Sequence, residues 1–221
     1  MEDKKTYETE IKKLASQERF SFEDFVGVVK LLRALCPWDH EQTHVSIRKN
    51  LIEEAYEVVE GIDKNDASIM KEELGDLMLQ VIFHSVMGEE SGEYNINDVM
   101  TDICKKLIRR HPHIFDTVSA ETTDKVLENW ENIKKIEKEN KTLSDELKSI
   151  SSSLPALVRS EKVCKKVRKR TGVSFDDEPI TEEEAGRLLF NLTSRCDASD
   201  VDAEEALFKY TERIIKEYEN N

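Results

Sequence analysis

Residues 50–87 read NLIEEAYEVVEGIDKNDASIMKEELGDLMLQVIFHSVM and form two apolar helical runs that carry acidic side chains at regular spacing. Glu54 and Glu57 are three residues apart in the first run, and Glu73 and Asp76 are three apart in the second. Residues at i and i+3 lie on one helix face, with Cβ atoms roughly 5–6 Å apart. Because only a short turn joins the runs, we expect antiparallel helices whose carboxylate pairs face one another across a groove.

Apolar residues surround both acid pairs, so we expect the two helices to be largely buried. Burial and mutual repulsion would both penalise four ionised carboxylates. A divalent cation removes this conflict, and Mg²⁺ in particular takes oxygen ligands while keeping positions open for water and phosphate. In a chain that is 36% charged, a solvated acidic face is the alternative interpretation. Two facing pairs within apolar runs favour a metal site.

These acids form the pattern Glu-Glu-x-x-Glu at 53–57 followed by Glu-x-x-Asp at 73–76. The pattern resembles that of the MazG-type nucleoside triphosphate pyrophosphohydrolases, which belong to the all-α NTP pyrophosphatase superfamily. Four ordered motifs strengthen the resemblance: CPWDHEQTH at 36–44, EELGDLMLQVIFH at 72–84, KLIRRHPHIF at 106–115 and NWENIKKIEK at 129–138. The resemblance covers about residues 20–140 and continues weakly beyond them.

The resemblance implies an all-α helical bundle with a carboxylate-lined groove, assembled as a homodimer whose partner completes the helical packing. It also implies hydrolysis of nucleoside or deoxynucleoside triphosphates to the monophosphate and pyrophosphate, by attack of a metal-activated water at the α-phosphorus. The implied cofactor is Mg²⁺, with Mn²⁺ as a substitute. The implied metal ligands are Glu54, Glu57, Glu73 and Asp76, and Glu53 would orient the attacking water or help to accept its proton.

Three cations, Lys106, Arg109 and Arg110, share one side of a predicted helix that ends at Arg110. By themselves they could simply complement the dipole of the helix C-terminus. The resemblance favours a clamp for the triphosphate instead. It also places Trp130 and Lys134 near the nucleotide, although a lone tryptophan is by default a packing residue.

The chain is predicted to have an arm at 1–19 that is loose or partly helical, a catalytic helical domain at 20–142 and a serine-rich linker at 143–153. Residues 154–221 would form a shortened second copy of the repeat. Helix caps and breakers set the expected helix bounds. These bounds are 21–36, 43–61, 67–88, 97–110, 123–140, 154–172, 181–195 and from 202 onward.

The second copy is recognised by EEAGRLLFNL at 183–192, which mirrors EELGDLMLQV at 72–81. Arg187 stands where the first copy has Asp76, and no Glu-Glu-x-x-Glu pattern precedes it. A metal site needs several converging oxygens, so this copy is expected to pack or regulate and to do no chemistry. We expect Arg187 to pair with Glu183 or Glu184, or to face solvent.

A formal net charge of −14 disfavours nonspecific binding to nucleic acid or to an anionic membrane. The four scattered cysteines are typical of reduced thiols, and no apolar run approaches the roughly 20 residues of a membrane span. We therefore expect a cytoplasmic protein whose partners are its nucleotide and a second copy. A dinuclear iron bundle is a rival reading, but it would use Glu-x-x-His pairs; a non-catalytic helical interaction module is the other alternative. The preferred base and sugar, the physiological nucleotide and the number of metal ions stay open.

Overall fold

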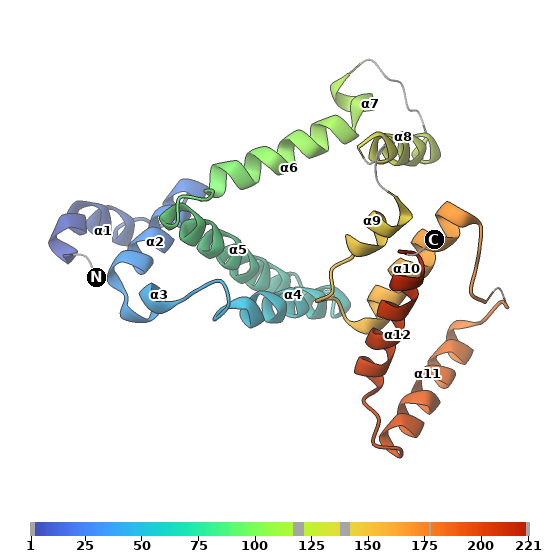
Figure 1. The fold of residues 1–221 in the computed structure, drawn as a ribbon. Coiled ribbons are helices and arrows are strands. Elements are labelled where there is room, and N and C mark those ends of the chain that lie inside the picture. The colour runs from blue at the N-terminus through green and yellow to red at the C-terminus, as the bar shows by residue number, and fades with distance from the viewer. Residues whose placement is uncertain (1–2, 117–121, 138–141, 177, 220–221) are drawn as a thin grey trace. The chain divides into compact units, whose positions relative to one another are not determined.

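The computed structural model describes residues 3–116, 122–137, 142–176 and 178–219, and within these ranges all regular structure is helical (Figure 1). The prediction of an all-α protein is therefore confirmed. The chain divides into two compact units, Met1–Val126 and Leu127–Asn221. Among the described residues, no helix combines the length and the apolar character needed to cross a bilayer.

In its described residues, the first unit has a short 3₁₀ helix η1 and seven α-helices before the boundary. Their bounds are η1 Lys4–Tyr7, α1 Glu8–Ala15, α2 Phe22–Leu35, α3 Pro37–Glu41, α4 Arg48–Asp63, α5 Ala67–Glu90, α6 Ile96–Arg110 and α7 Pro112–Phe115. Helix α8, Thr123–Ile136, spans the boundary between the units. The second unit continues with α9 Leu143–Lys148, α10 Ala156–Thr171, α11 Glu182–Asp197 and α12 Ala203–Glu217.

Side-chain caps begin several helices where the sequence predicts them. Ser21 and Asp24 form a reciprocal capping box at α2, and the Asp66 carboxylate accepts hydrogen bonds from backbone N–H groups at the start of α5. The predicted start of α4 at residue 43 was wrong, because Thr43 and Ser46 cap each other's backbone N–H groups in a turn. Serine and threonine compete with helices in this way, so α4 begins at Arg48.

Helices α4 and α5 form an antiparallel hairpin, as the short turn between them predicts (Figure 1). Their close approach depends on Gly61, where an added Cβ would lie 2.9 Å from the backbone nitrogen of Met70. The C-terminal half of α5 is buried against α2 and the start of α6. The core there consists of Val29, Ile47, Ile82, Phe83, Val86, Met87 and Ile96.

The expectation that both hairpin helices are largely buried was wrong for α4, where only Gly61 is buried. Apolar side chains on the outer faces of α4 and of the first two thirds of α5 are exposed, because no helix in the described part of the first unit covers them. The exposed set is Ile52, Tyr56, Val59, Ile62, Leu74, Met78 and Val81.

Arg33 on α2 ties α2, α3 and the end of α5 together. Its guanidinium is only 8% exposed and donates to the backbone carbonyls of Asp39, His40 and Gln42. It also donates to the Glu90 carboxylate at 2.5 Å. One buried cation therefore holds the 39–42 segment, which leads into α4, against the rest of the unit.

The prediction of a linker at 143–153 was wrong. A capping box of Thr142 and Asp145 begins α9, and Leu147 and Ile150 are buried in the core of the second unit. The cause is that the serines lie mainly at 149–153, after the helix, while the leucines at 143 and 147 share a face one turn apart. The core also contains Val163, Val167 and Ile215 from α10 and α12.

Helix α11 carries the sequence that mirrors α5. Its Arg187 pairs with Glu184 at 3.6 Å, which confirms the expectation that this cation meets a neighbouring acid. Both groups are exposed at the surface. The apolar side chains of α11 are also exposed, from 46% for Leu189 to 76% for Phe190.

Candidate metal centre

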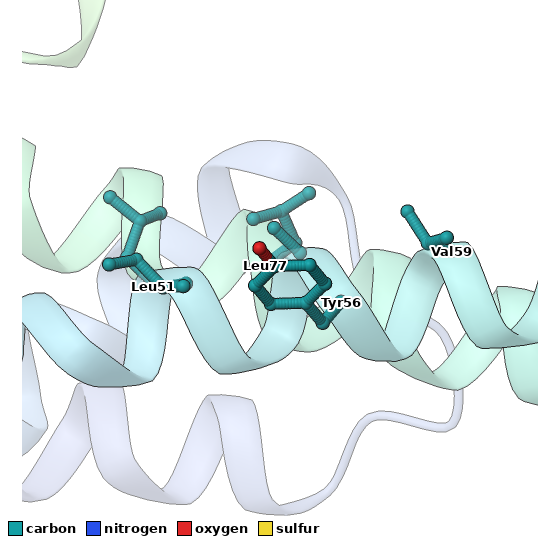
Figure 2. Close-up of a pocket in the computed structure, with 6 residues that line it drawn as sticks. Leu51, Tyr56, Val59 and Leu77 are labelled. Atoms are coloured by element: carbon teal, nitrogen blue, oxygen red, sulfur yellow. The ribbon is translucent and has the colours of Figure 1, made fainter. Parts of the chain in front are cut away.

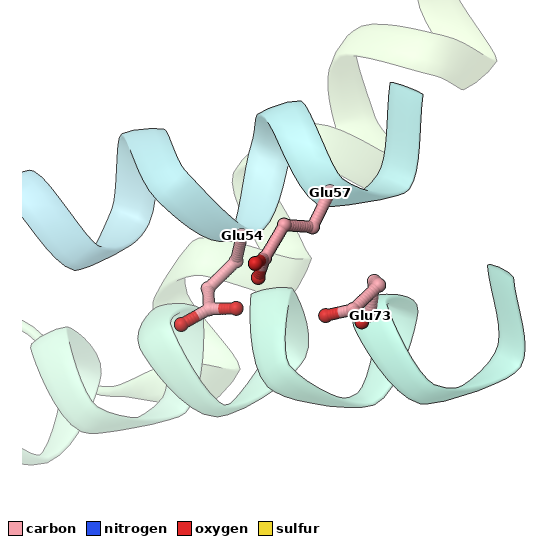
Figure 3. A group of neighbouring side chains, drawn as sticks. All are labelled: Glu54, Glu57 and Glu73. Carbon is pink, nitrogen blue, oxygen red and sulfur yellow. The ribbon is translucent and has the colours of Figure 1, made fainter. Parts of the chain in front are cut away.

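Three carboxylates converge between α4 and α5. Glu54 and Glu57 extend from α4 toward Glu73 on α5 (Figure 3). One oxygen from each of the three carboxylates lies within 4.8 Å of the others. All three side chains are half-buried. The prediction that these acids face one another is thus confirmed in the geometry, while their role as ligands stays a prediction.

Burial and the neighbouring acids disfavour the ionised forms of Glu54 and Glu73. Desolvation raises the pKa of Glu54, and the neighbouring Glu57, Asp76 and Glu73 raise it further. Desolvation is also the main cause of the raised pKa of Glu73, followed by the charges of Glu57, Glu72 and Asp76. Within the described part of the chain, no lysine or arginine forms an ion pair with Glu54, Glu57 or Glu73.

A divalent cation fits this donor set. The three converging groups are all carboxylates, which suits a hard ion such as Mg²⁺, and the cluster contains no histidine or thiolate that would favour a softer metal. Glu-x-x-His pairs, which a dinuclear iron bundle would use, are absent from this cluster. A bound cation would also offset the repulsion that raises the pKa values of Glu54 and Glu73.

Two further predicted acids lie beside the cluster. Asp76 is half-buried and close enough for its charge to act on both Glu54 and Glu73, although its carboxylate is not among the three that converge. Glu53 is exposed on α4, next to Glu54 in the chain. The structure therefore places four acids around one point of the hairpin, and Glu53 is the neighbour of one of them in the chain.

The structure does not bring the predicted phosphate-binding cations to the acids within one chain. Lys106, Arg109 and Arg110 lie in the last two turns of α6, and this helix diverges from α5 after the turn that joins them (Figure 1). Trp130 lies on α8 in the second unit and is half-buried. The backbone of Lys134 is helical, but its side chain lies outside the described residues.

A histidine pair beyond the acids was missed by the sequence reasoning. The Nδ1 atoms of His44 and His84 lie 2.7 Å apart, and the two rings stack with centroids separated by 5.0 Å. Burial and the neighbouring His44 lower the pKa of His84. Because 40 residues separate the two in the chain, no short-range pattern could indicate this pair.

An apolar groove of about 420 Å³ lies along the outer side of α4 (Figure 2). It is lined by Leu51, Ile52, Ala55, Tyr56 and Val59 from α4 and by Leu77 from α5. Leu51 and Ala55 flank Glu54 in the helix, so the groove adjoins the acidic cluster without contributing a charged group to it.

The sequence model of the family described as the MazG nucleotide pyrophosphohydrolase domain matches residues 42–115, which include all the acids of the cluster. A Bacillus subtilis protein, "Uncharacterized protein YabN", is 45% identical over 146 residues, which is 65% of this chain and 30% of that protein. The chain therefore spans less than a third of that relative. A MazG-related protein from Thermotoga maritima, solved by crystallography, superposes with a TM-score of 0.46 at 21% identity, over 51% of this chain and 98% of that one.

Two full-length relatives align over most of both chains. The "Nucleoside triphosphate pyrophosphohydrolase/pyrophosphatase MazG" of Thermotoga maritima is 35% identical, and the alignment covers 89% of this chain and 84% of that protein. The "Nucleoside triphosphate pyrophosphohydrolase" of Escherichia coli K12 is 36% identical, covering 83% of this chain and 79% of that protein. These alignments and the domain match show that the chain belongs to the MazG family of nucleotide pyrophosphohydrolases.

Proposed function

We propose that this protein hydrolyses nucleoside triphosphates, ribo- or deoxyribo-, to the nucleoside monophosphate and pyrophosphate in a Mg²⁺-dependent reaction. The convergence of Glu54, Glu57 and Glu73 is the observation that carries the proposal. It is supported by the names of the Thermotoga and Escherichia relatives, which are both described as nucleoside triphosphate pyrophosphohydrolases.

In this proposal Glu54, Glu57, Glu73 and Asp76 hold Mg²⁺, with Mn²⁺ as a substitute. The bound ion would offset the negative charge of the phosphate oxygens and lower the pKa of a water molecule. The raised pKa values of Glu54 and Glu73 support this assignment, because both carboxylates become easier to ionise when a cation lies between them.

The chain's own residues would orient the reactants. Water attacks the α-phosphorus, a new P–O bond forms, and the bond to the bridging oxygen of the β-phosphate breaks so that pyrophosphate leaves. Glu53, next to Glu54 in the chain, is exposed and would orient this water or accept its proton. Lys106, Arg109 and Arg110 would neutralise charge on the leaving pyrophosphate, while Trp130 and Lys134 would lie near the nucleotide.

The reaction would take place in a homodimer, in which a second copy completes the packing around residues 20–142. The exposed apolar side chains of α4 and of the first two thirds of α5 support this proposal. Helix α6 also has exposed apolar side chains, since Val99, Ile103 and Leu107 are each at least 36% exposed. Helix α6 diverges from its own α5, so these apolar side chains do not pack against that helix.

Turnover of a panel of nucleoside and deoxynucleoside triphosphates, with pyrophosphate detected directly, tests the proposal. We expect pyrophosphate release with Mg²⁺ and none with excess chelator. Sedimentation of the same sample should give the mass of a dimer. The competing hypothesis of a non-catalytic interaction module predicts no nucleotide turnover and tolerance of Glu57→Gln, so the same assay separates the two.

A further inference from the structure

The contact between α4 and α5 continues past the acids in a fixed register. Because the two helices are antiparallel, residues earlier in α4 lie opposite residues later in α5. Three adjacent pairs establish this register: Gly61 with Met70, Glu57 with Glu73, and Glu54 with Asp76. The next pair in the same register is Asn50 with Gln80, one helical turn or about 5.4 Å beyond the acids.

Gln80 is an unusual residue for its place in the fold. It is 7% exposed, and its side-chain oxygen is buried without a hydrogen-bond partner among the described residues. One turn further along the same face of α5, the Nε2 atom of His84 is also buried without a partner. Its Nδ1 atom is already engaged with His44 at 2.7 Å. Buried polar atoms without partners are costly and rare.

The surroundings of Gln80 make a purely packing role a poor explanation. The other buried side chains that follow on α5 are mostly apolar, including Ile82, Phe83 and Val86. An apolar residue at position 80 would fill the same space without burying an unpartnered oxygen. Asn50, opposite Gln80, is only half-buried, so a molecule in solvent can reach this level of the α4–α5 contact.

We propose that Gln80, together with Asn50 and His84, contacts the edge of the nucleobase and sets base preference. This proposal rests on the proposed function, because it takes the triphosphate to be held at the acids. The groups that follow along the α4–α5 contact are uncharged and include both donors and acceptors. Such groups match the neutral end of a nucleotide, and carboxamides pair well with base edges.

The decisive variant is Gln80→Met, which keeps the length of the side chain and removes its hydrogen-bonding atoms. Leu79→Met is its matched control, because it introduces the same side chain at the adjoining position, which packs against the core. The ratio kcat/KM is measured for the four common bases, each as ribo- and deoxyribonucleotide. We expect Gln80→Met to lower kcat/KM about tenfold for the best base and less for the others.

The loss should be the same for the ribo- and deoxyribo- forms of one base, since the contact is to the base. Inhibition by inorganic tripolyphosphate, which has no nucleoside, should be unchanged. An equal loss for every base would overturn the proposal, as would a loss for tripolyphosphate, an effect confined to the sugar, or the same pattern in Leu79→Met.

Direct binding separates this proposal from the proposed function. Calorimetric titration with the four nucleotides and with tripolyphosphate, in Mg²⁺, reports base discrimination even if no nucleotide is hydrolysed. Base discrimination that is present in the parent and reduced in Gln80→Met supports the nucleobase contact, whether or not the nucleotides are hydrolysed. Discrimination that is equal in the two proteins contradicts it, whether or not pyrophosphate is released.

Discussion

The Nδ1 atoms of His44 and His84 lie 2.7 Å apart and join the turn before α4 to the middle of α5. Burial and His44 both lower the pKa of His84 below its usual value of 6.5. As the pH falls through 6.5, the unfolded chain gains a proton at His84 before the folded protein does, so stability is lost. Above 6.5 this loss is absent.

We therefore expect the free energy of unfolding to fall between pH 6.5 and 5 more steeply in the parent than in His84→Gln. Urea unfolding of both proteins at several pH values measures the difference. Both proteins keep the other four histidines, so the difference between them reports the loss of His84 and of its contact with His44. A difference that stays constant across this range would contradict the assignment.

Arg33 and Lys30 offer a direct comparison of a buried and an exposed cation that each pair with the same helix, α5, from α2. Arg33 is 8% exposed and binds Glu90 and three backbone carbonyls. Arg33→Met should therefore cost roughly 1–3 kcal/mol of stability, because it leaves these carbonyls without their donor. Lys30 pairs with Glu89 at the surface, so Lys30→Met should cost at most about 1 kcal/mol. Equal costs in chemical denaturation would refute the account of Arg33.

The acids of the candidate metal centre should destabilise the metal-free protein at neutral pH. The pKa values of Glu54 and Glu73 are raised from the ordinary value of 4.5, so the folded protein keeps these protons longer than the unfolded chain. Below about pH 4.5 the raised pKa values do not lower the free energy of unfolding. As the pH rises above 4.5, the free energy of unfolding falls.

In chelator, Glu54→Gln should therefore be as stable as the parent near pH 4, and at pH 7 more stable by on the order of 1 kcal/mol. Adding Mg²⁺ should raise the melting temperature of the parent more than that of the variant. A variant that melts well below the parent in chelator at pH 7 would show that Glu54 has a structural role instead.

The region predicted to be a second copy of the repeat, residues 154–221, should take no part in the chemistry. Glu73 lies in the carboxylate cluster, whereas Glu184 in the mirrored sequence is exposed and pairs with Arg187 at 3.6 Å. Glu73→Gln should lower the rate of pyrophosphate release by orders of magnitude, and Glu184→Gln should leave it nearly unchanged. Comparable losses in the two variants would mean that the second copy contributes to the active site.

Local sequence signals predicted much of this fold. Capping residues such as Ser21, Asp66 and Thr181 begin helices where they should, because a cap depends only on the next few residues. The i,i+3 spacing of the acids likewise placed Glu54 and Glu57 on one face toward Glu73. These predictions needed only helical periodicity and a short turn.

Most of the failures depend on contacts between distant parts of the chain, whereas the wrong start of α4 has a local cause, the turn of Thr43 and Ser46. Composition alone suggested a linker at 143–153, but Leu147 is buried by α10 and α12. His44 and His84 are separated by 40 positions in the chain, and Arg33 and Glu90 are separated by 57 positions. The apolar pattern of α4 predicted a buried face. Such a pattern does not reveal which neighbour covers the face, and the structure shows it exposed.

Hydrolysis in ¹⁸O-labelled water tests the central claim most directly, because it reports which phosphorus the water attacks. A nucleoside triphosphate is turned over with Mg²⁺, and both products are weighed by mass spectrometry. Attack at the α-phosphorus predicts one ¹⁸O atom in the nucleoside monophosphate and none in the pyrophosphate. Label in the pyrophosphate, or formation of nucleoside diphosphate and orthophosphate, would contradict the reaction proposed for the Glu54–Glu57–Glu73 centre.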